Sequence, residues 1–183
     1  QGLLKPYVDL CRGELAPQSI TWTDLQRAVV LREHAWEHWL ENLDTNTTQY
    51  AILGADDVPV NIDWDRAFAI DSGHRFSRFQ KYRPMLPCAR TFLHADYVEG
   101  RVRLPLDLLA HEAAHIRHMR TDDVRTILER YTRVRFANEA SAAAAFVDRI
   151  VRRKQHLEVA AARFIRDLRE ERTKLATSAT PRE

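Results

Sequence analysis

The chain has 183 residues, of which 45% are hydrophobic and 30% charged, and its formal net charge is +2. This is the composition of an ordinary globular protein, long enough for one domain with a sizeable core. Acidic residues are interspersed among the arginines, so the charge pattern indicates no specific nucleic-acid partner. The sequence has no apolar run of membrane-spanning length and only two cysteines, Cys11 and Cys88, which together favour a cytoplasmic protein.

The first predicted element is a helix that follows a capping box, Thr23-Asp24-Leu25-Gln26, and ends near Asn42. Two short β-prone runs come next, from Gln49 to Leu53 and from Val58 to Asp63. The residues between them, Gly54-Ala55-Asp56-Asp57, have the turn chemistry of a hairpin. The sequence therefore predicts a helix that leads into a hairpin through a short polar loop.

The following segment is predicted to be irregular, and the rest of the chain helical. Residues 72–100 have no sustained period, and we expect one strand in them near Thr91 to Tyr97. Pro105 suits the first position of a helix that runs to about Met119, and Thr121 caps another helix. Asn138 opens a long third helix.

The last helix has an apolar stripe from Phe146 to Leu168, with a break allowed around Arg152-Arg153-Lys154. Its arginines alternate with acidic residues, which is typical of a solvated face. The tail from Ala176 is small, polar and Pro-containing, and such termini fray. We therefore expect one mostly helical α+β domain over residues 1–175 and a disordered tail at 176–183.

Asp44, Gln49 and Asp63 form the constellation with the most chemical information. Phosphoryl transfer needs a carboxylate that orients the attacking hydroxyl, together with an amide and a second carboxylate that bind metal ions. Asp44 lies in the polar loop after the first helix, Gln49 follows it by five residues, and Asp63 ends the second strand. Both carboxylates thus fall on neighbouring loops of one hairpin, as two shared metal ions require.

Two stretches of the chain also match a known pattern. The first reads Trp-Leu-Glu-Asn-Leu-Asp from Trp39 and continues to Gln49, and the second reads Ile-Asp-Trp-Asp from Ile62, with Ala67-Phe68 after it. Both resemble the catalytic and metal-binding loops of the phosphatidylinositol 3/4-kinase-like superfamily, and the second also looks like the metal loop of aminoglycoside phosphotransferases. The resemblance implies a kinase-like C-terminal lobe whose one short hairpin carries both loops.

By this resemblance, Asp44 would be the catalytic aspartate of a phosphotransferase, Gln49 and Asp63 would bind Mg²⁺, and ATP would donate the phosphoryl group to an unknown hydroxyl. The chain departs from the family pattern because Thr45 and Asn46 replace an Arg and a His, and Gln49 replaces an Asn. A glycine-rich phosphate cover and its strand lysine are also missing. The N-lobe would therefore come from the same longer protein or from another chain; otherwise the chain is a non-catalytic pseudokinase interaction module.

A second constellation indicates a different chemistry. His111-Glu112-Ala113-Ala114-His115 places two imidazoles at positions i and i+4 of a predicted helix, where both can bind Zn²⁺ while the glutamate acts as general base. Glu139 lies in a stretch that resembles the downstream glutamate helix of some zinc metallopeptidases and would be the third ligand. The alternative function is thus a zinc-dependent metallopeptidase in which Glu112 activates water. A histidine-rich surface stripe also explains the pattern.

Overall fold

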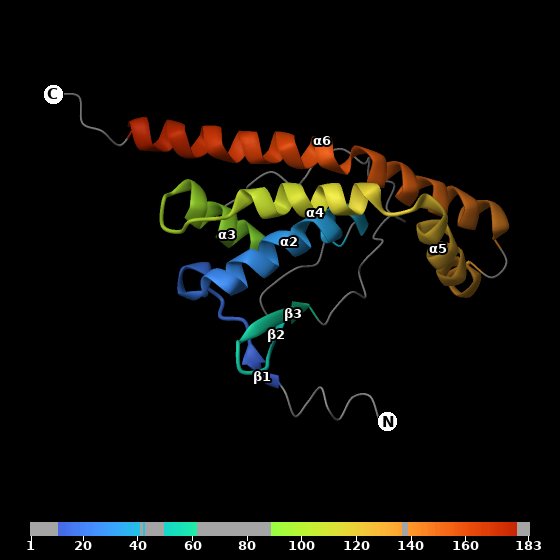
Figure 1. Cartoon of the computed structure of the whole chain (residues 1–183), viewed down its shortest axis with the longest axis horizontal. Coiled ribbons are helices and arrows are strands. Elements are labelled where there is room, and N and C mark those ends of the chain that lie inside the picture. The colour runs from blue at the N-terminus through green and yellow to red at the C-terminus, as the bar shows by residue number, and fades with distance from the viewer. Residues whose placement is uncertain (1–10, 41, 43–49, 62–88, 137–138, 179–183) are drawn as a thin grey trace.

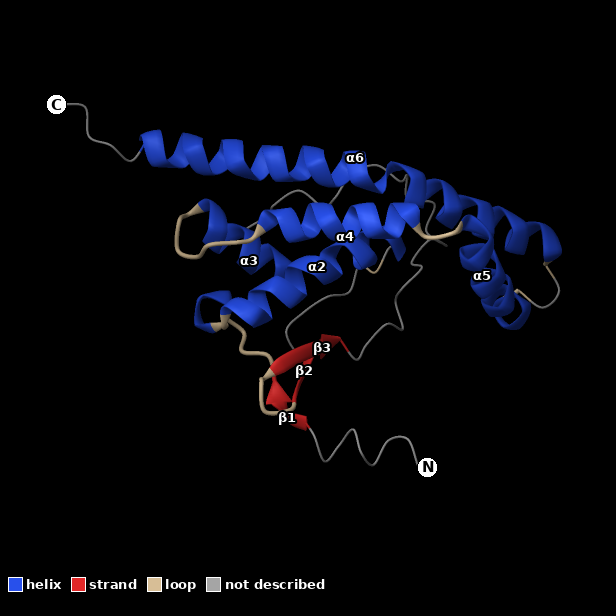
Figure 2. Ribbon diagram, in the orientation of Figure 1, coloured by secondary structure: helices blue, strands red, loops and turns tan. Residues whose placement is uncertain are grey.

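The structure is a computed structural model that describes residues 11–40, 42, 50–61, 89–136 and 139–178. These residues are mostly helical and contain one small antiparallel sheet of three strands. The mostly helical α+β class predicted from the sequence is therefore confirmed. Figure 2 shows the helices gathered in one body, with the sheet on one side of it.

Three long helices form the body of the protein. They are α2 (Asp24–Leu40), α4 (Leu106–His118) and α6 (Ala140–Ser178), and each contacts the other two. Figure 1 shows α4 between α6 and α2, with α3 (Ala89–Val98) at one end of α4 and α5 (Thr121–Arg135) at the other. No helix in the described ranges combines the length and the apolar character that a membrane span needs.

The sheet has the order β1-β2-β3, with β1 at Cys11–Glu14, β2 at Tyr50–Leu53 and β3 at Val58–Asn61. A short 3-10 helix, η1 (Ser19–Thr21), separates β1 from α2. In the hairpin, Tyr50 pairs with Asn61 and Leu53 pairs with Val58. The predicted hairpin is thus confirmed for these residues, whereas its predicted outer ends, Gln49 and Asp63, lie outside the described residues.

The capping box at the start of α2 is formed as predicted. The backbone N–H of Gln26 donates to Oγ1 of Thr23 over 3.1 Å, and the N–H of Thr23 donates to Oε1 of Gln26 over 3.0 Å. The Gln26 amide also donates from Nε2 to the carbonyl oxygen of Asp57, in the β2–β3 turn, over 3.1 Å. Gln26 therefore helps to cap the start of the helix and ties its first turn to the hairpin.

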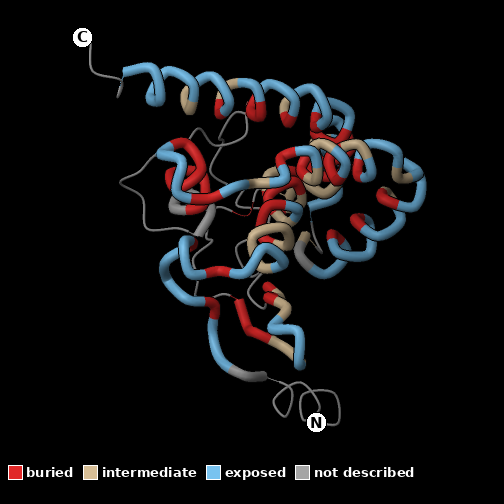
Figure 3. Tube along the Cα trace, turned by 60° about the vertical axis from the view of Figure 1, so that its left-hand side comes forward, coloured by how far each residue is buried: buried red, intermediate tan, exposed pale blue. Residues whose placement is uncertain are grey.

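One continuous cluster of buried apolar side chains joins the helices. Its fully buried members include Leu31 of α2, Leu109 and Ile116 of α4, and Leu157 and Leu168 of α6. Figure 3 shows buried stretches along the inner sides of the helices, whereas the outer side of α6 is exposed. Burial of such side chains is the main force that holds the layers together.

The predicted strand near Thr91 to Tyr97 is wrong, because residues 89–98 form the helix α3. Residues 93–98 are all buried, between η1, α2 and α6. A helix segment buried on every side has no polar face, so its sequence lacks the period that marks an amphipathic helix. Its aromatic and β-branched residues then resemble a strand.

The last helix also differs from the prediction. α6 continues without a break through Arg152-Arg153-Lys154, and both Arg153 and Lys154 are buried rather than solvated. The helix ends at Ser178 and so includes residues 176–178 of the predicted tail, and residues 179–183 lie outside the described residues. Thr177 Oγ1 donates to the carbonyl oxygen of Thr173 in this last part of the helix.

We expect Thr23→Ala to lower the free energy of unfolding by about 1 kcal/mol, because the Gln26 N–H loses its side-chain acceptor. Urea denaturation followed by circular dichroism measures the change. The control is Thr126→Ala, at an exposed position inside α5, where alanine has the higher helix propensity. An equal loss in the two variants would contradict the capping role of Thr23.

Candidate functional site

Four polar side chains are buried around the C-terminal end of α2. They are Glu37, with 1% of its surface exposed, Asn42 with 2%, Arg153 with 4% and Asn61 with 8%. We call these four residues the polar cluster. Burial of polar groups costs free energy unless they find partners, so charged residues are seldom this deeply buried. The polar cluster is therefore an unusual part of the described core.

Two residues of the polar cluster, Asn42 and Arg153, donate hydrogen bonds to the backbone carbonyl groups at the end of α2. The backbone N–H of Asn42 donates to the backbone carbonyl oxygen of Glu37 over 2.9 Å. Arg153 of α6 donates from Nε to the backbone oxygen of Trp39 over 2.9 Å, and from Nη2 to the backbone oxygen of His38. Because the last carbonyls of a helix have no partner inside it, these bonds satisfy groups that would otherwise be buried unpaired.

The end of α2 is tied to α6 in the other direction as well. The indole N–H of Trp39 donates to the backbone oxygen of Ile150, one turn before Arg153, over 3.0 Å. Nearby, burial and, to a smaller extent, the positive charge of Arg153 lower the pKa of His38 to about 3. His38 is therefore neutral at every pH near neutrality, and the cation beside it is the guanidinium of Arg153.

The hairpin meets α2 at the same place. Asn61, the last residue of β3, donates from Nδ2 to Oε1 of Glu37 over 3.4 Å. Asn61 is also the register partner of Tyr50, the first residue of β2. The end of α2, the start of β2 and the end of β3 therefore lie together at the open end of the hairpin.

The predicted phosphotransfer residues Asp44, Gln49 and Asp63 lie outside the described residues. In the sequence, Asp44 comes four residues after Leu40, which ends α2. Gln49 directly precedes β2, and Asp63 comes two residues after β3. The segments that carry these three residues are thus connected to the end of α2, the start of β2 and the end of β3. These three points lie together beside the polar cluster.

The residues predicted for a zinc site lie mainly on α4. Glu112 is buried and accepts hydrogen bonds from Nε1 of Trp36 and Nε of Arg32, each over 2.9 Å. The Nη2 atom of Arg32 also lies 2.8 Å from the carboxylate, so the two side chains form an ion pair. His111 and His115 are exposed. The glutamate therefore faces α2, whereas the two imidazoles face outward.

This environment makes Glu112 a structural carboxylate in the described fold. Burial alone would raise its pKa, but the hydrogen bonds from Trp36 and Arg32 and the nearby positive charges lower it below the ordinary value. Within the ranges that the structure describes, no three His, Cys, Asp or Glu side chains are placed to hold a metal ion. His111, His115 and Glu139 are thus not brought together, and the zinc site stays a prediction.

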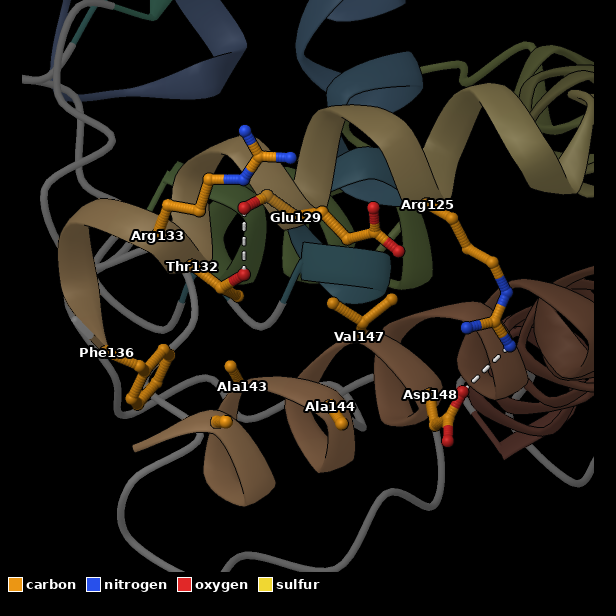
Figure 4. Close-up of a pocket in the computed structure, with 10 residues that line it drawn as sticks. Arg125, Glu129, Thr132, Arg133, Phe136, Ala143, Ala144, Val147 and Asp148 are labelled. Atoms are coloured by element: carbon orange, nitrogen blue, oxygen red, sulfur yellow. Dashed lines mark hydrogen bonds and ion pairs between the residues drawn. The ribbon is translucent and has the colours of Figure 1, made fainter. Parts of the chain in front are cut away.

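A hollow of about 480 Å³ lies between α5 and the first turns of α6. Figure 4 shows Arg125 of α5 reaching across to Asp148 of α6, 2.8 Å away, at one end of it. Phe136 lies at the other end of the view, and Thr132 donates to the backbone oxygen of Glu129. The hollow is thus crossed by an ion pair of the protein's own side chains, and none of the predicted site residues lines it.

The sequence carried a signal for two residues of the polar cluster that were not predicted. Arg153 lies within the apolar stripe of α6, between the buried Ile150 and Leu157, and Glu37 lies within the buried face of α2. A charged residue at such a position is either a break in the pattern or a buried polar contact.

No family model matches the chain, and no curated protein or solved structure matches it either.

We expect Glu112→Gln to lower the free energy of unfolding by about 1.5 to 3 kcal/mol at pH 7, as for the loss of a hydrogen bond to a charged group. Because the pKa of the folded state lies below the ordinary value of 4.5, the charged carboxylate stabilises the fold above that pH. This contribution is lost as the pH falls through the lower, folded-state value, so the difference between the two proteins shrinks in acid.

Urea denaturation of both proteins at pH 7 and at pH 3 measures this dependence. Glu158→Gln, which changes an exposed carboxylate on α6, is the control and is expected to have little effect at either pH. A difference between wild type and Glu112→Gln that is equally large at both pH values would show that the ion pair with Arg32 is not its source.

Proposed function

We propose that the chain is the C-terminal lobe of a kinase-like phosphotransferase, which transfers a phosphoryl group from ATP to a hydroxyl acceptor. One observation carries the proposal: the end of α2 and the two open ends of the β2–β3 hairpin meet at the polar cluster, held by the bond from Asn61 to Glu37. The segments predicted to hold the catalytic aspartate and the metal ligands begin or end at these three points.

The way in which α2 and the hairpin are joined strengthens this proposal. Gln26, in the first turn of α2, bonds to Asp57 in the hairpin turn. Glu37, in the last turn of α2, bonds to Asn61 at the open end of the hairpin. The hairpin is therefore fixed to the helix at two points, which favours one defined position for its open end relative to the end of α2.

The proposed roles follow from the chemistry of the three side chains. The carboxylate of Asp44 would accept a hydrogen bond from the acceptor hydroxyl and hold it in line with the phosphoryl group. The amide oxygen of Gln49 and the carboxylate of Asp63 are hard oxygen donors, which are the ligands that Mg²⁺ prefers. When bound, the metal ion would neutralise the charge that develops on the phosphate oxygens.

A complete site needs more than this lobe. The chain carries neither a glycine-rich phosphate cover nor a lysine between Lys5 and Lys81. In kinases, these parts belong to the N-lobe and hold the nucleotide phosphates. We therefore propose that an N-lobe, in the same longer protein or in another chain, completes the nucleotide site.

We expect Asp44→Asn to lower the rate of phosphoryl transfer by about 10²- to 10⁴-fold, the range for loss of a positioned acid–base group. Asp63→Asn is expected to raise the Mg²⁺ concentration needed for half-maximal rate, because a neutral amide binds the ion more weakly. Transfer of radioactive phosphate from ATP, measured in the protein as its gene encodes it, gives both values.

The matched control is Asp56→Asn, which removes an exposed carboxylate at the opposite end of the hairpin, in its turn. Its rate is expected to equal that of the wild type. A wild-type rate in Asp44→Asn would contradict the catalytic role of Asp44, and an unchanged Mg²⁺ requirement in Asp63→Asn would contradict metal binding by Asp63. A wild-type protein without transfer would favour the pseudokinase alternative, and stoichiometric zinc that is lost in His111→Ala would favour the metallopeptidase.

A further inference from the structure

Two adjacent basic residues of α6 are buried, and each contacts the C-terminal end of a different helix. Arg153 donates to the His38 and Trp39 oxygens at the end of α2. Lys154 donates from Nζ to the backbone oxygen of Met119, the C-cap residue that follows α4. Successive residues of a helix point about 100° apart, so one turn of α6 serves two neighbouring helices.

These contacts combine charge with hydrogen bonding. The C-terminal end of a helix carries a partial negative charge, so a cation is stabilised there. Burial of the Lys154 ammonium is unfavourable for its charged form. Burial and, to a smaller extent, the positive charge of Arg117 lower the pKa of Lys154. Each cation is thus kept in the core by the carbonyl groups that it contacts.

The helix ends that Arg153 and Lys154 contact are followed by different segments of the chain. After the end of α4, the chain enters α5 within a few residues, and no predicted site residue lies between the two helices. After the end of α2, the chain enters residues 41–49, which contain the predicted catalytic Asp44 and the predicted metal ligand Gln49. Arg153 therefore acts on the end that leads into the proposed site, and Lys154 does not.

The shape of the guanidinium suits this position. Its planar fork presents several N–H groups in fixed directions, so Nε and Nη2 bond two successive carbonyls at once. A lysine ammonium is a point charge on a flexible stem and does not reproduce this two-point contact. The fork thus holds the last turn of α2 by two successive carbonyl groups.

We infer that Arg153 is a positioning residue, which holds the C-terminal end of α2, the point from which the chain leads to the predicted catalytic Asp44. The inference rests on the proposed function for its effect on the rate, but its structural part stands on the contacts of α6 with α2. Small displacements of reacting groups are costly, and a shift of about 1 Å can lower a rate by about 10²-fold.

The test compares Arg153→Met with Lys154→Met, because the two substitutions remove neighbouring buried cations of the same helix. Hydrogen–deuterium exchange of the peptide that covers residues 41–49 is the first measurement. We expect exchange to become at least about tenfold faster in Arg153→Met and to stay within about twofold of wild type in Lys154→Met. Exchange of β2 and β3 reports whether the rest of the fold is intact.

The second measurement is the rate of phosphoryl transfer by the protein as its gene encodes it. We expect Arg153→Met to lower kcat by about tenfold or more while KM for ATP changes little, since the loss is one of orientation. Arg153→Lys keeps the charge and one hydrogen bond, so we expect an intermediate kcat. This variant also serves if Arg153→Met does not fold.

The outcomes separate the inference from the proposed function. Equal exchange in residues 41–49 for the Arg153 and Lys154 variants would overturn the inference, and so would a kcat lowered equally by both substitutions. If the wild-type protein transferred no phosphate, the proposed function would fail. The exchange data would then still decide whether Arg153 positions the end of α2.

Discussion

The buried cations Arg153 and Lys154 join one turn of α6 to the ends of α2 and α4. Two of the three long helices, α2 and α4, end against the middle of α6, where unpaired carbonyl groups would be costly. α6 supplies a guanidinium to one end and an ammonium to the other. The neighbouring turn of α6 also receives the indole N–H of Trp39. The helix layer is thus specified by polar contacts as well as by apolar packing.

α2 connects this layer to the sheet. Its first turn bonds to the hairpin turn through Gln26, and its last turn bonds to the open end of the hairpin through Glu37. Arg153 of α6 bonds to the same last turn. A helix held in this way is a rigid base for the loops that leave it, and rigid elements are where precise sites are built. The loops proposed to carry the phosphotransfer residues leave from this base.

Local patterns predict the elements whose signals are local. The reciprocal bonds of Thr23 and Gln26 and the β2–β3 hairpin follow from capping and turn chemistry, which a few neighbouring residues determine. The helix α3 escapes such patterns because its residues 93–98 are all buried, and that burial depends on elements far away in the sequence. Arg153 has the sequence signal of a break or a solvated face, since the carbonyl groups that explain it belong to α2. Glu112 matches a zinc motif, but its partners, Arg32 and Trp36, become visible only in the folded chain.

The proposed phosphotransfer site requires that metal ligands gather at the open end of the β2–β3 hairpin. Mn²⁺ is paramagnetic and broadens the NMR signals of nearby amide groups, so a titration of the chain with Mn²⁺ locates even a weak site. We expect the amides of Tyr50 and Asn61, at the open end, to broaden first. Broadening that began at the exposed Asp56 and Asp57 of the turn, or at His111 and His115, would contradict the proposed site.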